Sequence, residues 1–168
     1  GDIFLQILTD LKREGWKEQA NILEAKMRIR AEHWTAEAYT FGSEMPWDST
    51  GQEEVYAWTK YFGHQDKAEV TLNAILGYDP TIPHWGYNGS ARRYWDFIFA
   101  AKVRRLERQL HHYGSAINAI PLLVEYREHP ESFYLLRVGY GGTMGALTDI
   151  DEEGFASAAF HAFPDMLK

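Results

Sequence analysis

Apolar residues recur at helical spacing along most of this chain. The longest such stripe lies near the start and comprises Trp16, Ala20, Leu23, Met27, Ala31 and Trp34. Steps of three and four residues place side chains on one face of an α-helix. No segment alternates apolar and polar residues over a convincing length, as a half-buried strand would. The pattern therefore predicts an all-α fold in which β-sheet is at most minor.

Glycines divide the first half of the chain into paired stripes. Gly15 lies between the long stripe and a shorter one before it. Gly63 lies between two further stripes, which are Val55, Trp58 and Phe62 before it and Ala68, Leu72, Ile75 and Leu76 after it. Glycine is favoured just past the end of a helix. Both pairs are therefore expected to form antiparallel helical hairpins.

The second half of the chain continues the same pattern. Residues 92–113 carry an apolar stripe that predicts a helix, and Gly114-Ser115 provides its stop and the N-cap of the next helix. A last apolar segment is predicted to end at Gly139-Tyr140-Gly141-Gly142, which is interpreted as a loop where the backbone approaches another segment closely.

Composition narrows the class of ligand. The chain has 168 residues, enough for one hydrophobic core, and a net charge of −7 that disfavours nucleic acid and anionic membranes as partners. It has no Cys, which excludes thiolate metal sites, and no apolar run long enough to span a membrane. No cofactor and no metal are predicted. Aromatic residues make up 15% of the chain, an excess that favours stacking on a sugar-like ligand.

One acidic segment is a candidate for catalysis. Glu44, Asp48, Glu53 and Glu54 lie around a loop that leads into a predicted helix start. General acid and base chemistry on an acetal uses two carboxylates whose surroundings separate their pKa values. Structural roles remain open for each residue: Glu53 has the spacing of a capping box with Thr50, Asp48 is suited to an N-cap, and the other two suit a solvated surface.

Aromatic and polar residues gather in a second loop, rich in glycine. Rings stack on the apolar faces of sugars, while amides and guanidinium groups hydrogen-bond their hydroxyls. The candidate substrate-binding residues are Trp47, His84, Trp85, Tyr87, Asn88, Arg92, Arg93 and Tyr140.

A short acidic run near the end of the chain has part of a calcium-loop pattern. Asp149 and Asp151 begin the spacing of an EF-hand, but Phe160 stands where the twelfth-position Glu is needed. An EF-hand is therefore rejected, and a looser Ca²⁺ site at Asp149 and Asp151 stays open.

Two motifs together resemble a known family. The segments Gly42-Ser43-Glu44-Met45-Pro46-Trp47-Asp48 and His84-Trp85-Gly86-Tyr87-Asn88-Gly89-Ser90 are similar to those of an uncharacterised family of large secreted bacterial and fungal proteins, whose helical region resembles the six-hairpin glycosidases. The resemblance implies antiparallel helical hairpins that form part of an (α/α)6 toroid, a carbohydrate substrate, and an extracellular or periplasmic location. Because the chain begins at Gly1 without a Met, residues 1–168 are expected to be a single helical domain or a partial toroid, with the remaining domains of a longer parent chain as partners.

Three functions remain open at this point. The leading hypothesis is a glycoside hydrolase that uses one of the four carboxylates as general acid and another as base or nucleophile. A polysaccharide lyase would instead use Tyr87 or Tyr140, with His84 and Arg92, to abstract a proton beside a uronate carboxylate. The third is a non-catalytic glycan-binding or structural helical domain.

Overall fold

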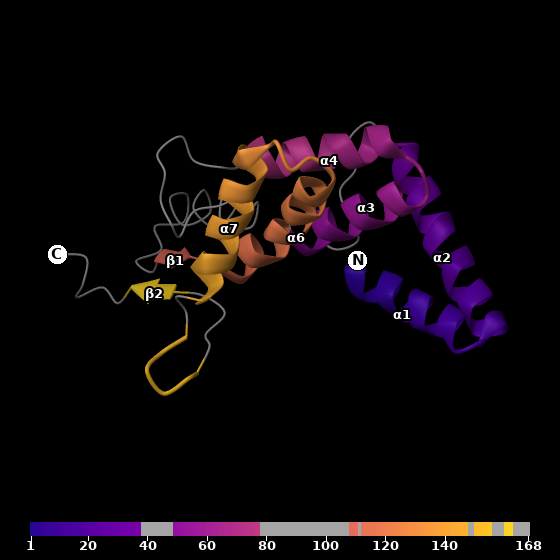
Figure 1. Ribbon diagram of the computed structural model, residues 1–168, viewed down its shortest axis with the longest axis horizontal. Helices are drawn as coiled ribbons and strands as arrows, with labels where there is room; N and C mark the ends of the chain where they lie inside the picture. The colour runs from indigo at the N-terminus through magenta and orange to yellow at the C-terminus, as the bar shows by residue number, and fades with distance from the viewer. Residues whose placement is uncertain (38–48, 78–107, 111, 148–149, 156–159, 163–168) are drawn as a thin grey trace.

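The described part of the protein is almost entirely helical. The computed structural model describes residues 1–37, 49–77, 108–110, 112–147, 150–155 and 160–162. The helices in these ranges are α1 (Asp2–Arg13), α2 (Lys17–Thr35), α3 (Ser49–Tyr61), α4 (Gln65–Gly77), α6 (His112–Glu128) and α7 (Phe133–Leu147) (Figure 1). The prediction of an all-α fold in which β-sheet is at most minor is confirmed over these residues.

Glycine ends the first helix of each of the first two pairs, as the sequence predicts. Gly15 has a φ of 78°, and the backbone N–H of Trp16 donates to the carbonyl of Leu11 at 2.9 Å. At Gly63 φ is 84°, and the N–H of His64 donates to the carbonyl of Thr59 at 2.8 Å. A left-handed residue followed by a bond that reaches back five residues is the Schellman helix end. It reverses the chain between α1 and α2 and between α3 and α4.

The predicted helix over 92–113 is wrong at its described end. Residues 108–110 form a strand, β1 (Arg108–Leu110), which pairs antiparallel with β2 (Phe160–Ala162). Arg108 lies opposite Ala162 in this two-stranded sheet. β2 lies about fifty residues further along the chain than β1. The local spacing of apolar residues near Leu110 therefore cannot indicate this pairing.

Two predicted helix boundaries are also wrong. α6 begins at His112 and runs through Gly114-Ser115, which fall in its first turn. The backbone N–H groups of a first turn have no partner within the helix. α7 continues through the glycine run to Leu147. A Cβ at Gly139 would lie 2.8 Å from side-chain atoms of Leu123 on α6. The predicted close approach therefore exists, but it is an approach between two helices and not a loop.

α3 lies at the centre of the fold. It packs against α1, α2, α4 and α6 and contributes to two hydrophobic clusters. The first cluster joins α3 to α1 and α2, and the second joins it to α4, α6 and α7. Trp58 faces the first cluster, where its ring centroid lies 5.7 Å from that of Trp34 and 5.7 Å from that of Phe4. Tyr56 faces the second, with Ile75 of α4 and residues of α6 and α7.

Burial follows the predicted stripes at some positions and departs from them at others: in the shorter stripe before Gly15, Ile3, Phe4 and Ile7 are exposed. Trp34 and Trp58 are both 5% exposed, as the helical spacing predicts. Trp16 is 58% exposed because it is the residue that precedes α2, outside the helical turn that would carry it to the core.

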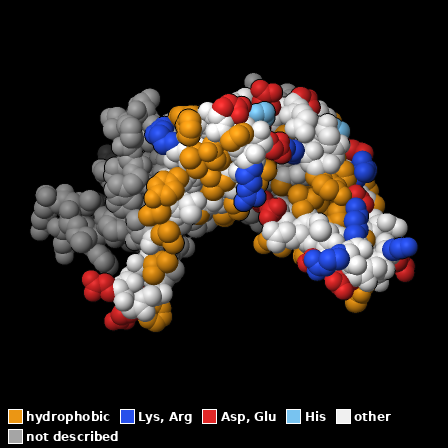
Figure 2. Space-filling model, viewed as in Figure 1, with side chains coloured by type: hydrophobic (Ala, Val, Ile, Leu, Met, Phe, Trp, Pro, Cys, Tyr) orange, Lys and Arg blue, Asp and Glu red, His pale blue; other side chains and the backbone are white. Residues whose placement is uncertain are grey.

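The surface retains exposed apolar side chains. In Figure 2 the described part of the protein forms an arch, and hydrophobic side chains run down the leg that carries α7. On α1 the exposed apolar side chains are Ile3, Phe4 and Ile7, and on α7 they are Phe133, Tyr134, Tyr140, Met144 and Leu147. None of the helices in the described ranges has the length and apolar character needed to cross a membrane.

Replacing Trp58 by Ala should destabilise the protein by about 3–5 kcal/mol, because it removes a large buried ring from the cluster shared by α1, α2 and α3. The exposed Trp16 provides the matched control, and Trp16→Ala should change the free energy of unfolding by less than about 0.5 kcal/mol. Urea denaturation of the two variants measures both values. Equal effects would contradict the assignment of Trp58 to the core.

Candidate functional site

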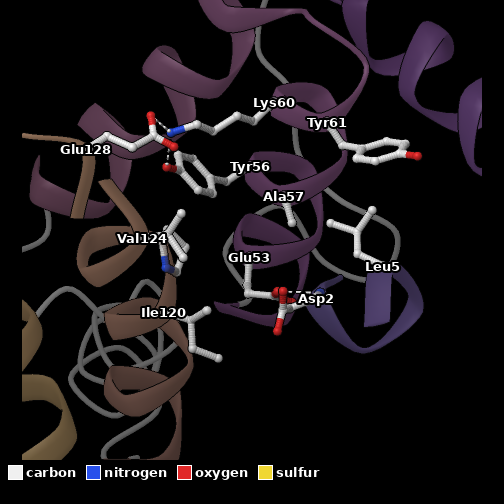
Figure 3. Close-up of a pocket in the computed structure, with 11 residues that line it drawn as sticks. Asp2, Leu5, Glu53, Tyr56, Ala57, Lys60, Tyr61, Ile120, Val124 and Glu128 are labelled. Atoms are coloured by element: carbon white, nitrogen blue, oxygen red, sulfur yellow. Dashed lines mark hydrogen bonds and ion pairs between the residues drawn. The ribbon is translucent and has the colours of Figure 1, made fainter. Parts of the chain in front are cut away.

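A groove of about 250 Å³ lies between α1, α3 and α6. Its lining combines apolar side chains with carboxylates, two tyrosines and one lysine: Asp2, Leu5, Glu53, Tyr56, Ala57, Lys60, Tyr61, Ile120, Pro121, Val124 and Glu128. In Figure 3 the apolar side chains of Ile120 and Val124 face Ala57 and Leu5 across the groove, and the charged groups lie towards its two ends.

Helical spacing explains why these residues share one groove. Glu53, Ala57 and Lys60 follow one another on α3 at steps of four and three residues. Ile120, Val124 and Glu128 do the same on α6 at steps of four. Side chains at these steps lie on one helix face. The groove is therefore formed by two facing helix stripes, with Asp2 and Leu5 of α1 closing one end.

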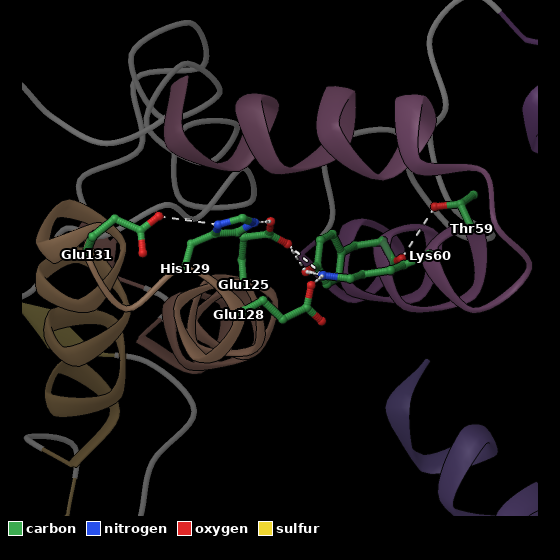
Figure 4. A network of polar contacts seen from close by, with 7 residues as sticks. Thr59, Lys60, Glu125, Glu128, His129 and Glu131 are labelled. Carbon is green, nitrogen blue, oxygen red and sulfur yellow. Dashed lines mark hydrogen bonds and ion pairs between the residues drawn. The ribbon is translucent and has the colours of Figure 1, made fainter.

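A polar network joins α3 to α6 at the other end of the groove (Figure 4). The Nζ of Lys60 donates to Glu125 at 2.7 Å and is paired with Glu128 at 2.8 Å. The hydroxyl of Tyr56 donates to the same Glu125 oxygen at 2.7 Å, and Lys60 donates to this hydroxyl at 3.1 Å. The side chains of Lys60 and Glu125 are only 16% and 21% exposed, so solvent screens this pair weakly.

The network shifts the pKa values of its members. Burial acts to lower the pKa of Lys60, but its hydrogen bonds to Glu125 and Glu128 outweigh burial and hold that pKa above its usual value. Burial, together with the hydrogen bond to Glu125, raises the pKa of Tyr56, which stays protonated at neutral pH. Burial acts to raise the pKa of Glu125, yet the bonds from Lys60 and Tyr56 prevail and lower it. Tyr56 is therefore a hydrogen-bond donor here and not a base.

The cluster next to this network has the donor atoms of a metal site. Ligand atoms of Glu125, Glu128 and His129 all lie within 4.8 Å of one another. His129 contacts Glu125 at 3.5 Å and Glu131 at 3.4 Å. The ammonium of Lys60 already lies against both carboxylates and compensates one of their two negative charges. The arrangement is thus explained as an ion-pair network that contains its own cation.

Glu53 lies in the wall of the groove, where its carboxylate contacts the start of α1. Its two oxygens accept hydrogen bonds from the backbone nitrogens of Gly1 at 2.6 Å and Asp2 at 2.7 Å. Carboxylates suit this position because the first N–H groups of a helix have no partners within it. Glu53 therefore caps α1, a helix other than the one that the capping-box spacing indicated.

Glu54 faces a different part of the molecule. Glu54 is the residue after Glu53 on α3. Its carboxylate lies 3.9 Å from the Nε of Arg30 on α2, and its side chain is 13% exposed. The guanidinium of Arg30 lies 5.3 Å from the ring centroid of Trp34. The structure therefore brings Glu53, but not Glu54, into the groove.

Most of the other predicted site residues lie outside the described residues. These are Glu44, Trp47, Asp48, His84, Trp85, Tyr87, Asn88, Arg92 and Arg93. Tyr140 is described; it lies on α7 and is 62% exposed. It is not among the residues that line the groove.

The predicted calcium run is described only in part. Asp149 lies outside the described residues, whereas Asp151 begins a tight turn. One of its carboxylate oxygens accepts the backbone N–H of Glu153 at 3.0 Å and that of Phe155 at 2.9 Å. This oxygen holds the turn together in the manner typical of Asp in turns.

Lys60, Glu125 and Glu128 are site residues that sequence reasoning missed. One signal was present in the chain, since Glu128 and His129 follow Glu125 by three and four residues, at the end of α6 and directly after it. Their partner Lys60 is 65 residues away from Glu125 along the chain. Only the packing of α3 on α6 brings the opposite charges together.

Comparison with known proteins identifies the family. The chain matches DUF5695, a family of unknown function, over residues 1–168. It belongs to this family. No curated protein and no solved structure matches it. Membership in DUF5695 thus supplies no reaction.

The lowered pKa of Glu125 predicts a pH-dependent contribution to stability. Because its pKa is lower in the folded than in the unfolded protein, its contribution is present above the usual value of 4.5 and is lost as the pH falls below it. Glu125→Gln should therefore lower the free energy of unfolding by about 1–3 kcal/mol at pH 7 and by much less at pH 3. Urea denaturation at both pH values measures the difference.

The exposed Glu32 on α2 provides a control for the loss of one negative charge. Glu32→Gln should have a small effect that is similar at both pH values. If Glu125→Gln behaves in the same way, the network does not stabilise the contact between α3 and α6.

Proposed function

We propose that this chain is part of a glycoside hydrolase and that the groove between α1, α3 and α6 holds one sugar ring of its substrate. The observation that carries the proposal is the chemistry of the groove, in which facing apolar walls are bordered at both ends by hydrogen-bonding and charged groups. Sugars need both, because their ring faces are apolar and their hydroxyls require donors and acceptors.

The size of the groove supports a single ring. Its volume of about 250 Å³ lies just below the roughly 300–1,000 Å³ of pockets that enclose a drug-sized ligand. The groove ends at α1 on one side and at the Lys60 network on the other. A longer oligosaccharide would have to continue outside these walls.

The catalytic carboxylates of the proposed hydrolase are drawn from Glu44, Asp48, Glu53 and Glu54. Of the two that the structure describes, Glu53 lines the groove and Glu54 faces Arg30 on α2. Burial of Glu53 in the wall, at 6% exposure, supports a role for it next to a bound ring. Its hydrogen bonds to the start of α1 hold its oxygens in fixed positions.

We also propose that the helices form part of an (α/α)6 toroid within a longer secreted protein. Two helix pairs, each joined by a Schellman turn at a glycine, support this arrangement. The apolar side chains exposed on α1 and α7 support it as well, because further helices of a toroid would cover such faces.

A larger side chain at Ala57 should block sugar binding, because this residue lies in the groove wall opposite Val124. Ala57→Leu is expected to weaken binding of oligosaccharides at least tenfold in calorimetric titrations with a panel of neutral, amino and uronate oligosaccharides. Ala25→Leu, on the exposed face of α2, is the matched control and should bind as the original chain does. Failure of every member of the panel to bind the original chain would contradict the proposal.

Loss of the Glu53 carboxylate should reduce hydrolysis. In the full-length protein, Glu53→Gln is expected to lower kcat by about 100-fold or more, the usual contribution of an acid–base group, while Glu32→Gln leaves it unchanged. Release of reducing ends measures turnover, and thermal unfolding confirms that both variants fold. Full turnover by a folded Glu53→Gln variant would remove Glu53 from the mechanism. Products with a new carbon–carbon double bond would identify a lyase instead.

A further inference from the structure

The side chains that line the groove carry an excess of negative charge. Asp2, Glu53 and Glu128 contribute carboxylates, and Lys60 is the one cationic side chain among the lining residues. The ammonium of Lys60 is engaged with Glu125 and Glu128, so it does not offer an uncompensated positive charge to a ligand. A groove lined by one sign of charge concentrates ligands of the opposite sign.

The carboxylates differ in how accessible they are. Glu53 is directed at the start of α1, whereas the side chain of Glu128 is 53% exposed at the rim of the groove. One oxygen of Asp2 accepts a hydrogen bond from the side chain of Gln6 at 2.6 Å. Figure 3 places Glu128 at one end of the groove and Asp2 at the other, with the apolar walls between them. A cationic group at either end of a bound ring would meet a carboxylate.

Resting on the proposed function, we infer that the sugar bound in this groove is an amino sugar, a hexose with a free amine in its protonated form. Its apolar ring face lies between the walls formed by Leu5, Ala57 and Val124, and its ammonium pairs with Glu128 or Asp2 at the rim. This assignment rests on the apolar walls and on charge complementarity. The lining carboxylates favour the binding of a cationic ligand and disfavour the binding of an anionic one in the groove.

The same charges disfavour uronates. A uronate carboxylate in the groove would lose water and approach Asp2, Glu53 and Glu128 without a free cation to receive it. Lys60 would have to leave Glu125 and Glu128 in order to bind it. The groove is therefore selective against the substrates that a lyase of the uronate-eliminating type requires.

Monosaccharide titrations test this inference without assuming a linkage. Glucosamine, galactosamine and mannosamine are each compared with their neutral parents glucose, galactose and mannose, with glucuronate, and with ethylammonium as a cation without a ring. The readout is the change in amide chemical shifts of the isotope-labelled chain. At least one amino sugar should bind tenfold or more tightly than its neutral parent at low salt. This preference should shrink in 1 M NaCl, where the screening length falls to about 3 Å.

Charge variants connect the preference to the groove. Glu128→Gln should reduce the preference for the amino sugar at least threefold and leave the affinity for the neutral parent unchanged. Glu69→Gln, at an exposed position of α4, removes the same charge elsewhere and should have no effect.

Each outcome separates the inference from the proposed function. Equal binding of amino and neutral sugars, or preferential binding of glucuronate, would overturn the inference and leave a sugar site in place. Equal effects of the Glu128 and Glu69 variants would assign the preference to the net charge of the chain and overturn the inference as well. Binding of ethylammonium as tightly as glucosamine would show an amine site and not a sugar site. If no sugar binds, the proposed function fails and the inference fails with it.

Discussion

The ion-pair network around Lys60 is the interaction on which the described site depends. A single ammonium lies between two carboxylates of α6, and the hydroxyl of Tyr56 completes the contact from α3. Removing one member of such a partly buried group leaves its partners without compensation, which costs more than the same change on the surface. α3 also packs against α1, α2 and α4. The contact of α3 with α6 therefore sets the width of the groove, which is lined by α1, α3 and α6.

Much of the fold follows from local sequence patterns, for reasons visible in particular residues. Trp34, Trp58, Ala68 and Ile75 are buried where the helical spacing places them, since one helix stripe needs only local periodicity to define it. The pairing of β1 with β2 could not be predicted because its two strands lie far apart in the chain. The glycines of α7 predict a break in the helix, but α7 runs through them to Leu147. Gly139 instead allows the backbones of two helices to approach, an effect that depends on Leu123 of a neighbouring helix.

The candidate site was less predictable than the helices. Its charged residues come from three helices, and the decisive contacts join positions that are distant in the chain, such as Lys60 with Glu125 and Glu53 with Asp2. The spacing of Glu53 indicates a capping box in its own helix, but its carboxylate binds the start of α1 instead. Helical periodicity places a residue on one face of its own helix, whereas the helix that covers this face is chosen by the packing of the whole chain. For the same reason Glu53 and Glu54, neighbours in sequence, face α1 and α2 respectively.

The central claim is that the network couples α3 to α6 strongly enough to hold the groove open between them. A double-mutant cycle with Lys60→Met, Glu125→Gln and the combined variant measures this coupling directly through the free energies of unfolding. We expect a coupling energy of about 1–3 kcal/mol, above the roughly 0.2–1 kcal/mol of exposed ion pairs, because both side chains are mostly buried. A coupling energy near zero, with the two single effects adding independently, would contradict the account.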